Sequence, residues 1–284
     1  MTDLLVYATE SRAQTARTVL GAACQALGIS ARLELYGSGS LYQRLGPRRS
    51  QPLPDVVMWF GPFAARAAAV DGLLQPYQPS QVADGVPHDP NWAWTTLDYA
   101  PIGVVGTPGL TSFQELAAVP RLAVADPERS EVGMSLLLAV LDRARQVEAD
   151  PERGWTWWQQ RVRSGLALTE DDAGAVASIG EGGITHALSL AETAVALPCL
   201  APLPHAIGLA ANSRNVEGGR TLLDWMTSQA AAPLLRLSPW QAASNGLQAL
   251  LTAAPPLDVD WARQQYTPAR HRWADSGFGP SVES

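Results

Sequence analysis

The sequence predicts an α/β protein built on parallel strands, and a repeated local pattern carries that prediction. Three apolar or alternating runs, at 29–36, 55–60 and 121–125, each end in a polar or glycine-bearing turn that leads into a helical pattern. Strands that alternate with helices in this way form parallel sheets covered by helices. Because the pattern occurs in two blocks of a 284-residue chain, we expect two α/β lobes.

The N-terminal block begins with a short apolar strand at 4–8, followed by the polar turn Thr9-Glu10-Ser11. Apolar residues at helical spacing come next, and Gly28 is placed to end that helix. The run 29–36 then alternates as a strand with one buried face does, and a short helical pattern occupies 41–45.

The turn Gly37-Ser38-Gly39-Ser40 joins that strand to that helix. A glycine-serine turn at a helix start presents backbone N–H groups and hydroxyls, which suits an anion or another polar group. The alternative is a plain tight turn, in which the glycines supply positive φ and the serines cap the helix. The turn alone does not decide between these two interpretations.

The continuous apolar run 55–60 is typical of a central strand that is covered on both faces. Gly61-Pro62 follows it, and proline suits the first turn of a helix, here over 63–70. Three strands of this block therefore end in turns before helices. In an open α/β sheet such strand ends line the crevice where ligands bind.

The second block repeats the plan with a strand at 121–125, a turn at 126–133 and an amphipathic helix over about 134–147. Further strands are predicted at 97–105 and 206–211. Tryptophans at helical spacing are usually packing residues. That is our interpretation of Trp155, Trp157 and Trp158.

Composition excludes several classes of function. The net charge is −7 without a basic stripe, which argues against nucleic acid as a partner. No apolar run approaches the roughly 20 residues that span a membrane.

The first strand begins three residues from the start, so we expect either a cytosolic protein or a chain whose leader has been removed. Cys24 and Cys199 form no metal-spaced motif, and whether they pair stays open.

Several pieces of the chain occur together, in order, in one family of receptors. They are Val6-Tyr7 with its polar turn, Gly37 to Leu41, Asp55 to Gly61, Gly72 to Tyr77, Asp126-Pro127 with Ser130 and Gly133, Gly180 to Gly182, and Leu223 to Ser228. Over roughly residues 4 to 235 the chain resembles the extracytoplasmic solute-binding proteins of bacterial ABC importers. The resemblance is to the two-lobed class that includes iron(III), thiamine, 2-aminoethylphosphonate and phosphoglycerate receptors. No single piece is specific, and their order and spacing carry the resemblance.

The resemblance implies a type II periplasmic-binding-protein (Venus-flytrap) fold, with two lobes joined by two hinge strands and a ligand between them. Lobe one would comprise 1–98 and 206–284, and lobe two 99–205. The hinge crossings would lie near 96–105 and 206–211. It further implies a periplasmic monomer that partners a membrane permease and needs neither a cofactor nor a metal.

The positions that carry over from the family are the turns at the strand ends. They are Thr9, Ser11, Ser38, Gly39, Ser40, Trp59, Gly61, Ser130, Glu131 and Gly133. Hydroxyls and helix starts there could hold phosphate, phosphonate or carboxylate oxygens. The favoured ligand is therefore a small organic anion or zwitterion, such as a phosphonate or phosphate ester. Trp59 could equally pack inside its lobe.

Two departures from the family bear on the ligand. Many relatives have Ser-Gly-Thr after the Asp-Pro turn, where this chain has Ser130-Glu131-Val132-Gly133. Glu131 in a cleft would repel an anion and favour an amine, although it could also face solvent at the helix start. Ferric receptors of this class use adjacent tyrosines in the second lobe. No tyrosine occurs between Tyr99 and Tyr266, which argues against ferric ion held in that way.

Three other functions remain as alternatives. A thiamine-like cation is the second choice of ligand, given ten tryptophans and Glu131. A cytosolic ligand-sensing domain of the same fold would suit the missing leader. An enzyme is disfavoured because the sequence has no Gly-x-Ser-x-Gly, Walker or His-Glu-x-x-His motif, and its four histidines are scattered. We therefore expect no catalytic residues.

Overall fold

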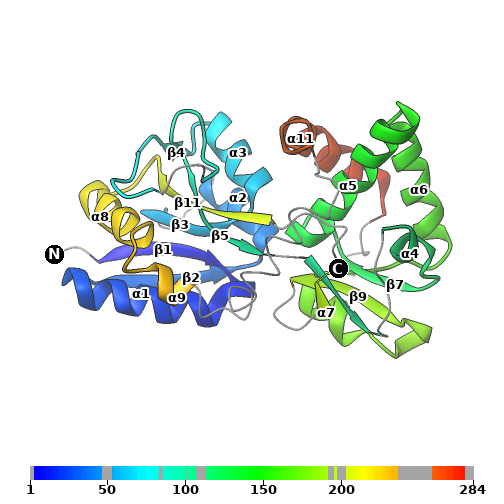
Figure 1. Ribbon diagram of the computed structural model, residues 1–284, viewed down its shortest axis with the longest axis horizontal. Helices are drawn as coiled ribbons and strands as arrows, with labels where there is room; N and C mark the ends of the chain where they lie inside the picture. The colour runs from blue at the N-terminus through cyan, green and yellow to red at the C-terminus, as the bar shows by residue number, and fades with distance from the viewer. Residues whose placement is uncertain are drawn as a thin grey trace. The chain divides into compact units, whose positions relative to one another are not determined.

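The computed structural model describes residues 3–46, 53–82, 86–100, 102–106, 113–190, 195–196, 203–235 and 258–278 (Figure 1). The chain forms two compact units. Unit 1 comprises Met1–Tyr99 and Leu203–Ala243, and unit 2 comprises Ala100–Pro202 and Ser244–Ser284. Each unit contains its own mixed sheet with helices packed on it.

The sheet of unit 1 has the strand order β2-β1-β3-β11-β4, and β5 also pairs with β11. Its strands are β1 (Leu4–Thr9), β2 (Ala31–Tyr36), β3 (Val56–Phe60), β4 (Leu74–Gln75), β5 (Thr95–Ala100) and β11 (Leu203–Ala210). As predicted, β1 is parallel to both β2 and β3. The late strand β11 is instead antiparallel to β3 and β4.

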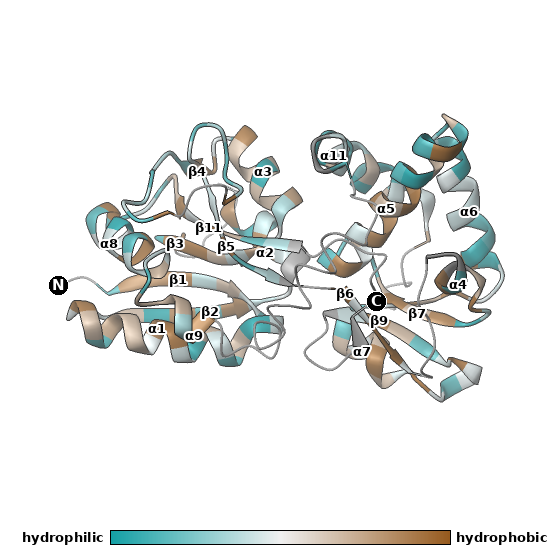
Figure 2. Cartoon of the chain, in the orientation of Figure 1, coloured by the Kyte–Doolittle hydropathy of each residue, from teal (hydrophilic) through white to brown (hydrophobic). Residues whose placement is uncertain are grey.

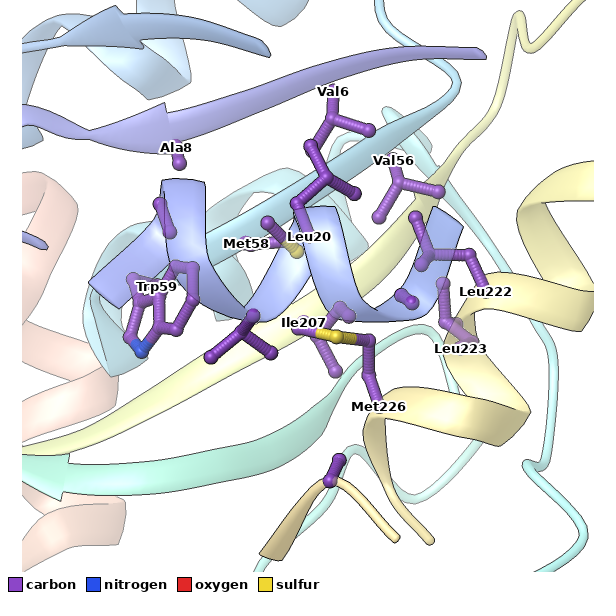
Figure 3. Close-up of a cluster of buried hydrophobic side chains, with 14 of the residues drawn as sticks. Val6, Ala8, Leu20, Val56, Met58, Trp59, Ile207, Leu222, Leu223 and Met226 are labelled. Carbon is purple, nitrogen blue, oxygen red and sulfur yellow. The ribbon is translucent and has the colours of Figure 1, made fainter. Parts of the chain in front are cut away.

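Helices cover this sheet. They are the 3-10 turn η1 (Glu10–Arg12) and the helices α1 (Ala13–Leu27), α2 (Ser38–Leu45), α3 (Pro62–Val70), α8 (Val216–Met226) and α9 (Ala232–Leu235). Gly28 ends α1 in the left-handed region at φ 64°, as predicted for a glycine at that position. Apolar residues from β1, β3, β11, α1 and α8 form the core, in which Met58, Ile207 and Met226 are fully buried (Figure 3).

Asp55 fastens the segment that follows β11 to the start of β3. Its carboxylate is buried and accepts hydrogen bonds from the backbone N–H groups of Leu5, Arg214 and Asn215, and from the Ser213 hydroxyl. Burying a carboxylate is costly unless hydrogen bonds satisfy its oxygens. These four donors meet that need and fix the path of the chain into α8.

The sheet of unit 2 has the order β10-β6-β9-β7-β8. Its strands are β6 (Ile102–Gly106), β7 (Leu122–Ala125), β8 (Ala167–Thr169), β9 (His186–Leu190) and β10 (Val195–Ala196). β7 is parallel to β8 and β9, whereas β6 is antiparallel to β9 and β10. The single strand predicted at 97–105 is therefore two strands, because β5 pairs in unit 1 and β6 pairs in unit 2.

The helices of unit 2 are α4 (Phe113–Ala118), α5 (Glu131–Glu148), α6 (Glu152–Arg163), α7 (Asp172–Ala177) and α11 (Val259–Ser276), with the 3-10 turn η2 (Glu181–Gly183). α5 is largely hydrophobic and mostly buried, whereas α6 is largely hydrophilic (Figure 2). Trp155 and Trp158 of α6 are buried, which confirms their interpretation as packing residues.

The C-terminal helix corrects the expected lobe assignment, which placed all of 206–284 in lobe one. α11 packs on α5 within unit 2. Trp273 Nε1 donates to the Asp126 carboxylate at 2.7 Å, and its ring meets that of Trp158 edge to face at 5.2 Å. The buried Trp273 side chain needs both an apolar site and an acceptor for its N–H. Unit 2 supplies both.

Candidate ligand-binding residues

Three neighbouring parallel strands bring their carboxyl ends to one edge of the unit 1 sheet. β1 lies between β2 and β3 and is parallel to both. The turns that follow these strands, at Thr9 to Ser11, at Gly37 to Ser40 and at Gly61, therefore lie at that same edge. Ligands of open α/β sheets bind at this edge, so the structure brings the predicted unit 1 positions together.

Hydroxyl groups at this edge differ in accessibility. The Thr9 hydroxyl is buried and lies 3.2 Å from the Ser11 hydroxyl, and Ser11 is exposed. Ser40 donates its hydroxyl to the Gly37 carbonyl at 2.9 Å. Gly37 has φ −56°, so the positive φ considered for this turn is not found there. The side chain of Ser38 lies outside the described residues.

The starts of α2 and α3 lie at this edge without side-chain caps. The residues before them are Gly37 and Gly61, which have no side chain that could cap the helix. Helix starts of this kind present backbone N–H groups that favour negative charge. This edge of unit 1 therefore suits an anionic or hydrogen-bond-accepting group.

Trp59 packs inside unit 1. Its side chain is fully buried in the core (Figure 3), and its indole N–H donates to the Asp98 carboxylate at 2.9 Å. Its backbone adopts φ 52°, a conformation that costs a bulky residue energy and that the surroundings must impose. Of the two uses considered for Trp59, the structure supports packing.

Asp98 lies at the centre of a buried ionic cluster that the sequence did not predict. Arg12 approaches its carboxylate at 3.3 Å and His205 Nδ1 at 3.1 Å, and all three side chains are at most 2% exposed. Burial alone would raise the pKa of Asp98, but the Arg12 charge and the His205 contact outweigh it and lower that pKa. Asp98 therefore stays ionised and ties β5, β11 and the turn after β1 together.

The corresponding edge of unit 2 is built on β7 and β8, which are parallel neighbours. The turn after β7 leads to Ser130, which caps α5 by accepting from the N–H groups of Val132 and Gly133 at 3.1 and 3.3 Å. The Ser130 hydroxyl in turn donates to Asp172, at the start of α7, at 2.6 Å. The hydroxyl predicted to contact a ligand is thus already engaged as a helix cap.

Asp172 has an unusual proton affinity. Burial raises the pKa of its carboxyl, the Ser130 hydrogen bond lowers it, and the charges of Glu131 and Asp171 raise it again, to about 7. Desolvation and neighbouring like charge both disfavour a carboxylate. Asp172 can therefore exchange a proton near neutral pH. No local pattern in the sequence singled it out.

Glu131 does not face solvent, so that alternative is wrong. Its side chain is 8% exposed, and its charge acts on Asp172. The carboxyl groups of Glu131 and Asp172 thus both lie at this edge of unit 2.

Gly133 serves close packing. A Cβ atom added at this position would lie 2.1 Å from the Ala125 carbonyl oxygen and 2.9 Å from the Pro127 nitrogen. Only glycine lets the first turn of α5 approach the end of β7 so closely. This close packing explains why position 133 is a glycine, so no ligand contact is needed to explain it.

Two kinds of feature are absent from the described part of the chain. Its His, Cys, Asp and Glu residues form no group of three arranged to hold a metal ion. Within the same residues, no helix combines the length and the apolar character needed to cross a membrane. Cys199 lies outside these residues, and the Cys24 thiol is free.

No protein-family model and no curated protein matches the sequence. Solved structures do match it. Apo ferric ion-binding protein A from Pasteurella haemolytica is similar with a TM-score of 0.74 and 15% identity, over 100% of both chains. The periplasmic binding protein AfuA from Actinobacillus pleuropneumoniae, with fructose-6-phosphate bound, gives 0.70 and 14%, over 96% of this chain and 98% of that one. A periplasmic thiamin binding protein gives 0.66 and 20%, over 95% of each chain.

This chain has the two-lobed fold of periplasmic binding proteins. The match extends over nearly the whole of both chains in each comparison, so both units belong to the fold. Identities of 20% or less leave the ligand undetermined, since proteins of one fold bind different solutes.

Proposed function

We propose that the chain is the solute-binding component of a bacterial ABC importer, which captures a small polar solute outside the cytoplasm and delivers it to a membrane permease. The observation that carries the proposal is the periplasmic-binding-protein fold over essentially the whole chain. Polar turns at the carboxyl ends of parallel strands in each unit support it. We further propose that it acts as a monomer and binds its solute without converting it.

The solute class is a finer proposal. The uncapped helix starts and the Ser11 hydroxyl of unit 1 suit the oxygens of a phosphonate or phosphate ester. The carboxyl groups of unit 2 suit an amine instead. Our first choice is a small organic anion or zwitterion, such as a phosphonate or phosphate ester, with a thiamine-like cation as the alternative.

A thermal-shift screen tests the proposal. The full chain is unfolded, washed free of trapped solute and refolded. It is then heated with phosphonates, phosphate esters, thiamine, polyamines, sugars, carboxylates and ferric citrate. A solute at a hundredfold excess over its dissociation constant stabilises the folded state by about 2.7 kcal/mol. A shift with one chemical class, and recovery of that compound unchanged, supports a receptor.

Two results would contradict the proposal. Conversion of a bound compound to a product would indicate an enzyme. No shift with any class would remove the support for a solute receptor. A codon sequence upstream of Met1 that encodes an export signal would support the extracytoplasmic location, whereas a stop codon there would favour the cytosolic sensor.

A further inference from the structure

We propose that the starts of α5 and α7 in unit 2 form a subsite for a cationic group of the solute, such as an ammonium. This inference rests on the proposed function and specifies the chemistry of one part of its site. It assigns the subsite to Glu131, Asp172 and Ser135, all of which belong to unit 2.

The usual reason for an anion to bind a helix start is weakened at α5. Ser130 already accepts from the N–H groups of Val132 and Gly133. These are donors that would otherwise point at a bound anion. The carboxyl groups of Glu131 and Asp172 would also repel one. The same two carboxyl groups would attract a cation.

Ser135 is a separate sign that a polar partner is missing from this region. Its side chain is 3% exposed, and its hydroxyl has no hydrogen-bond partner among the described residues. Ser135 lies one helical turn after Glu131, and helical side chains lean toward the preceding turn. Ser135 and Glu131 therefore lie on the same face of α5, and Ser135 adds an unpartnered hydroxyl there. A buried polar group without a partner is costly, and a bound donor would remove that cost.

The charged groups described around Asp172 do not give it a positive partner. Glu131 and Asp171 act on it as like charges. Arg129, in the turn before α5, pairs with Glu170 at 2.6 Å. The strands β7, β8 and β9 pack against α7, and their titratable side chain is that of His186, whose Nδ1 contacts the Thr185 hydroxyl. An arriving cation would lower the pKa of Asp172 and displace its proton.

The test uses cationic probes beside analogues that lack the charge. Choline is compared with 3,3-dimethylbutan-1-ol, 2-aminoethylphosphonate with ethylphosphonate, and putrescine with butanediol; thiamine is added without an analogue. Binding to the refolded full chain is measured by calorimetry. We expect at least one probe with an ammonium group to bind more than about tenfold tighter than its analogue without the positive charge, because a buried carboxylate discriminates strongly for charge.

Variants identify the groups responsible. Asp172→Asn keeps an acceptor for Ser130 and should lower the affinity for the cationic probe by about tenfold or more. Glu131→Gln should also lower this affinity. Glu170→Gln is the matched control, because it removes a carboxylate of the same turn that is 75% exposed, and should change affinity little. For permanently charged choline or thiamine, affinity should rise about tenfold from about pH 6 to about pH 8 in the wild type. In Asp172→Asn the affinity for these probes should not change between these pH values.

The outcomes separate the subsite from the receptor proposal. If ethylphosphonate or another analogue without the positive charge binds as tightly as its ammonium-bearing partner, and Asp172→Asn leaves that affinity unchanged, the chain is a receptor but the cation subsite is refuted. A cationic probe that binds Asp172→Asn and Glu131→Gln as tightly as the wild type also refutes the subsite. If no probe binds here but a compound of another class gives a thermal shift, the subsite is refuted and the receptor proposal stands; if no compound of any class binds, both proposals are rejected.

Discussion

Replacing Asp172 by asparagine should stabilise the protein, and the gain should grow with pH. The folded-state pKa of Asp172 is about 7, compared with its ordinary value of 3.8. Between these pH values the folded protein holds a proton that the unfolded chain has released. The free energy of unfolding of the wild type therefore falls as the pH rises through this window. Asparagine carries no charge and keeps an acceptor for the Ser130 hydroxyl.

The size of the effect follows from the two pKa values. Ionising Asp172 in the folded state costs about 4 kcal/mol at about pH 8, but only about 1.5 kcal/mol of that cost is felt at about pH 5. The advantage of Asp172→Asn over the wild type should therefore increase by about 2.5 kcal/mol between these conditions. Desolvation is the main cause of the raised pKa, so the effect should persist at high salt.

Urea unfolding of both proteins, followed by circular dichroism at the two pH values, measures this difference. Glu170→Gln is the control, because its exposed carboxylate should give nearly the same small change at both pH values. A constant difference between Asp172→Asn and the wild type would refute the reasoning. It would mean that Asp172 ionises at its ordinary pKa in the folded protein.

Two further substitutions test packing and the buried charges. Gly133→Ala should destabilise the protein by about 1–3 kcal/mol, since its Cβ would overlap the Ala125 carbonyl; Gly21→Ala, which meets nothing within 4 Å inside α1, should be neutral or stabilising by up to about 1 kcal/mol. Equal effects in urea unfolding would contradict the close approach. Asp98→Ala should cost about 3–5 kcal/mol, because it removes the carboxylate that faces the buried Arg12 and His205. Asp3→Ala, at an exposed position, should change stability by less than about 0.5 kcal/mol, and a similarly small effect of Asp98→Ala would contradict the ionic cluster.

Local sequence signals predicted the parts of the fold that local interactions determine. Alternation and apolar runs identified β1, β2 and β3, Gly28 marked the end of α1, and the proline at position 62 marked the start of α3. Each signal concerns residues close together in the chain. The edge formed by the first three strands could therefore be predicted before the structure was known.

Contacts between distant residues could not be predicted in this way. Asp98 meets Arg12 and His205, which are 86 and 107 positions away along the chain. The Ser130–Asp172 hydrogen bond joins residues 42 positions apart. Because of this bond and the helix cap, the Ser130 hydroxyl is engaged within the protein, although the sequence predicted that it contacts a ligand. Trp273 likewise donates to Asp126, which is 147 positions away along the chain and in the same unit.

The position of β11 has a consequence for the order in which the protein can fold during synthesis. This strand lies between β3 and β4, yet it is made only after the whole of Ala100–Pro202. Until then β3 has an unpaired edge, which is prone to pairing with other chains. Unit 2 in turn waits for α11, near the end of the chain. Each unit is thus completed by a segment that is made after most of the other unit. Incomplete chains are therefore the species that chaperones must protect.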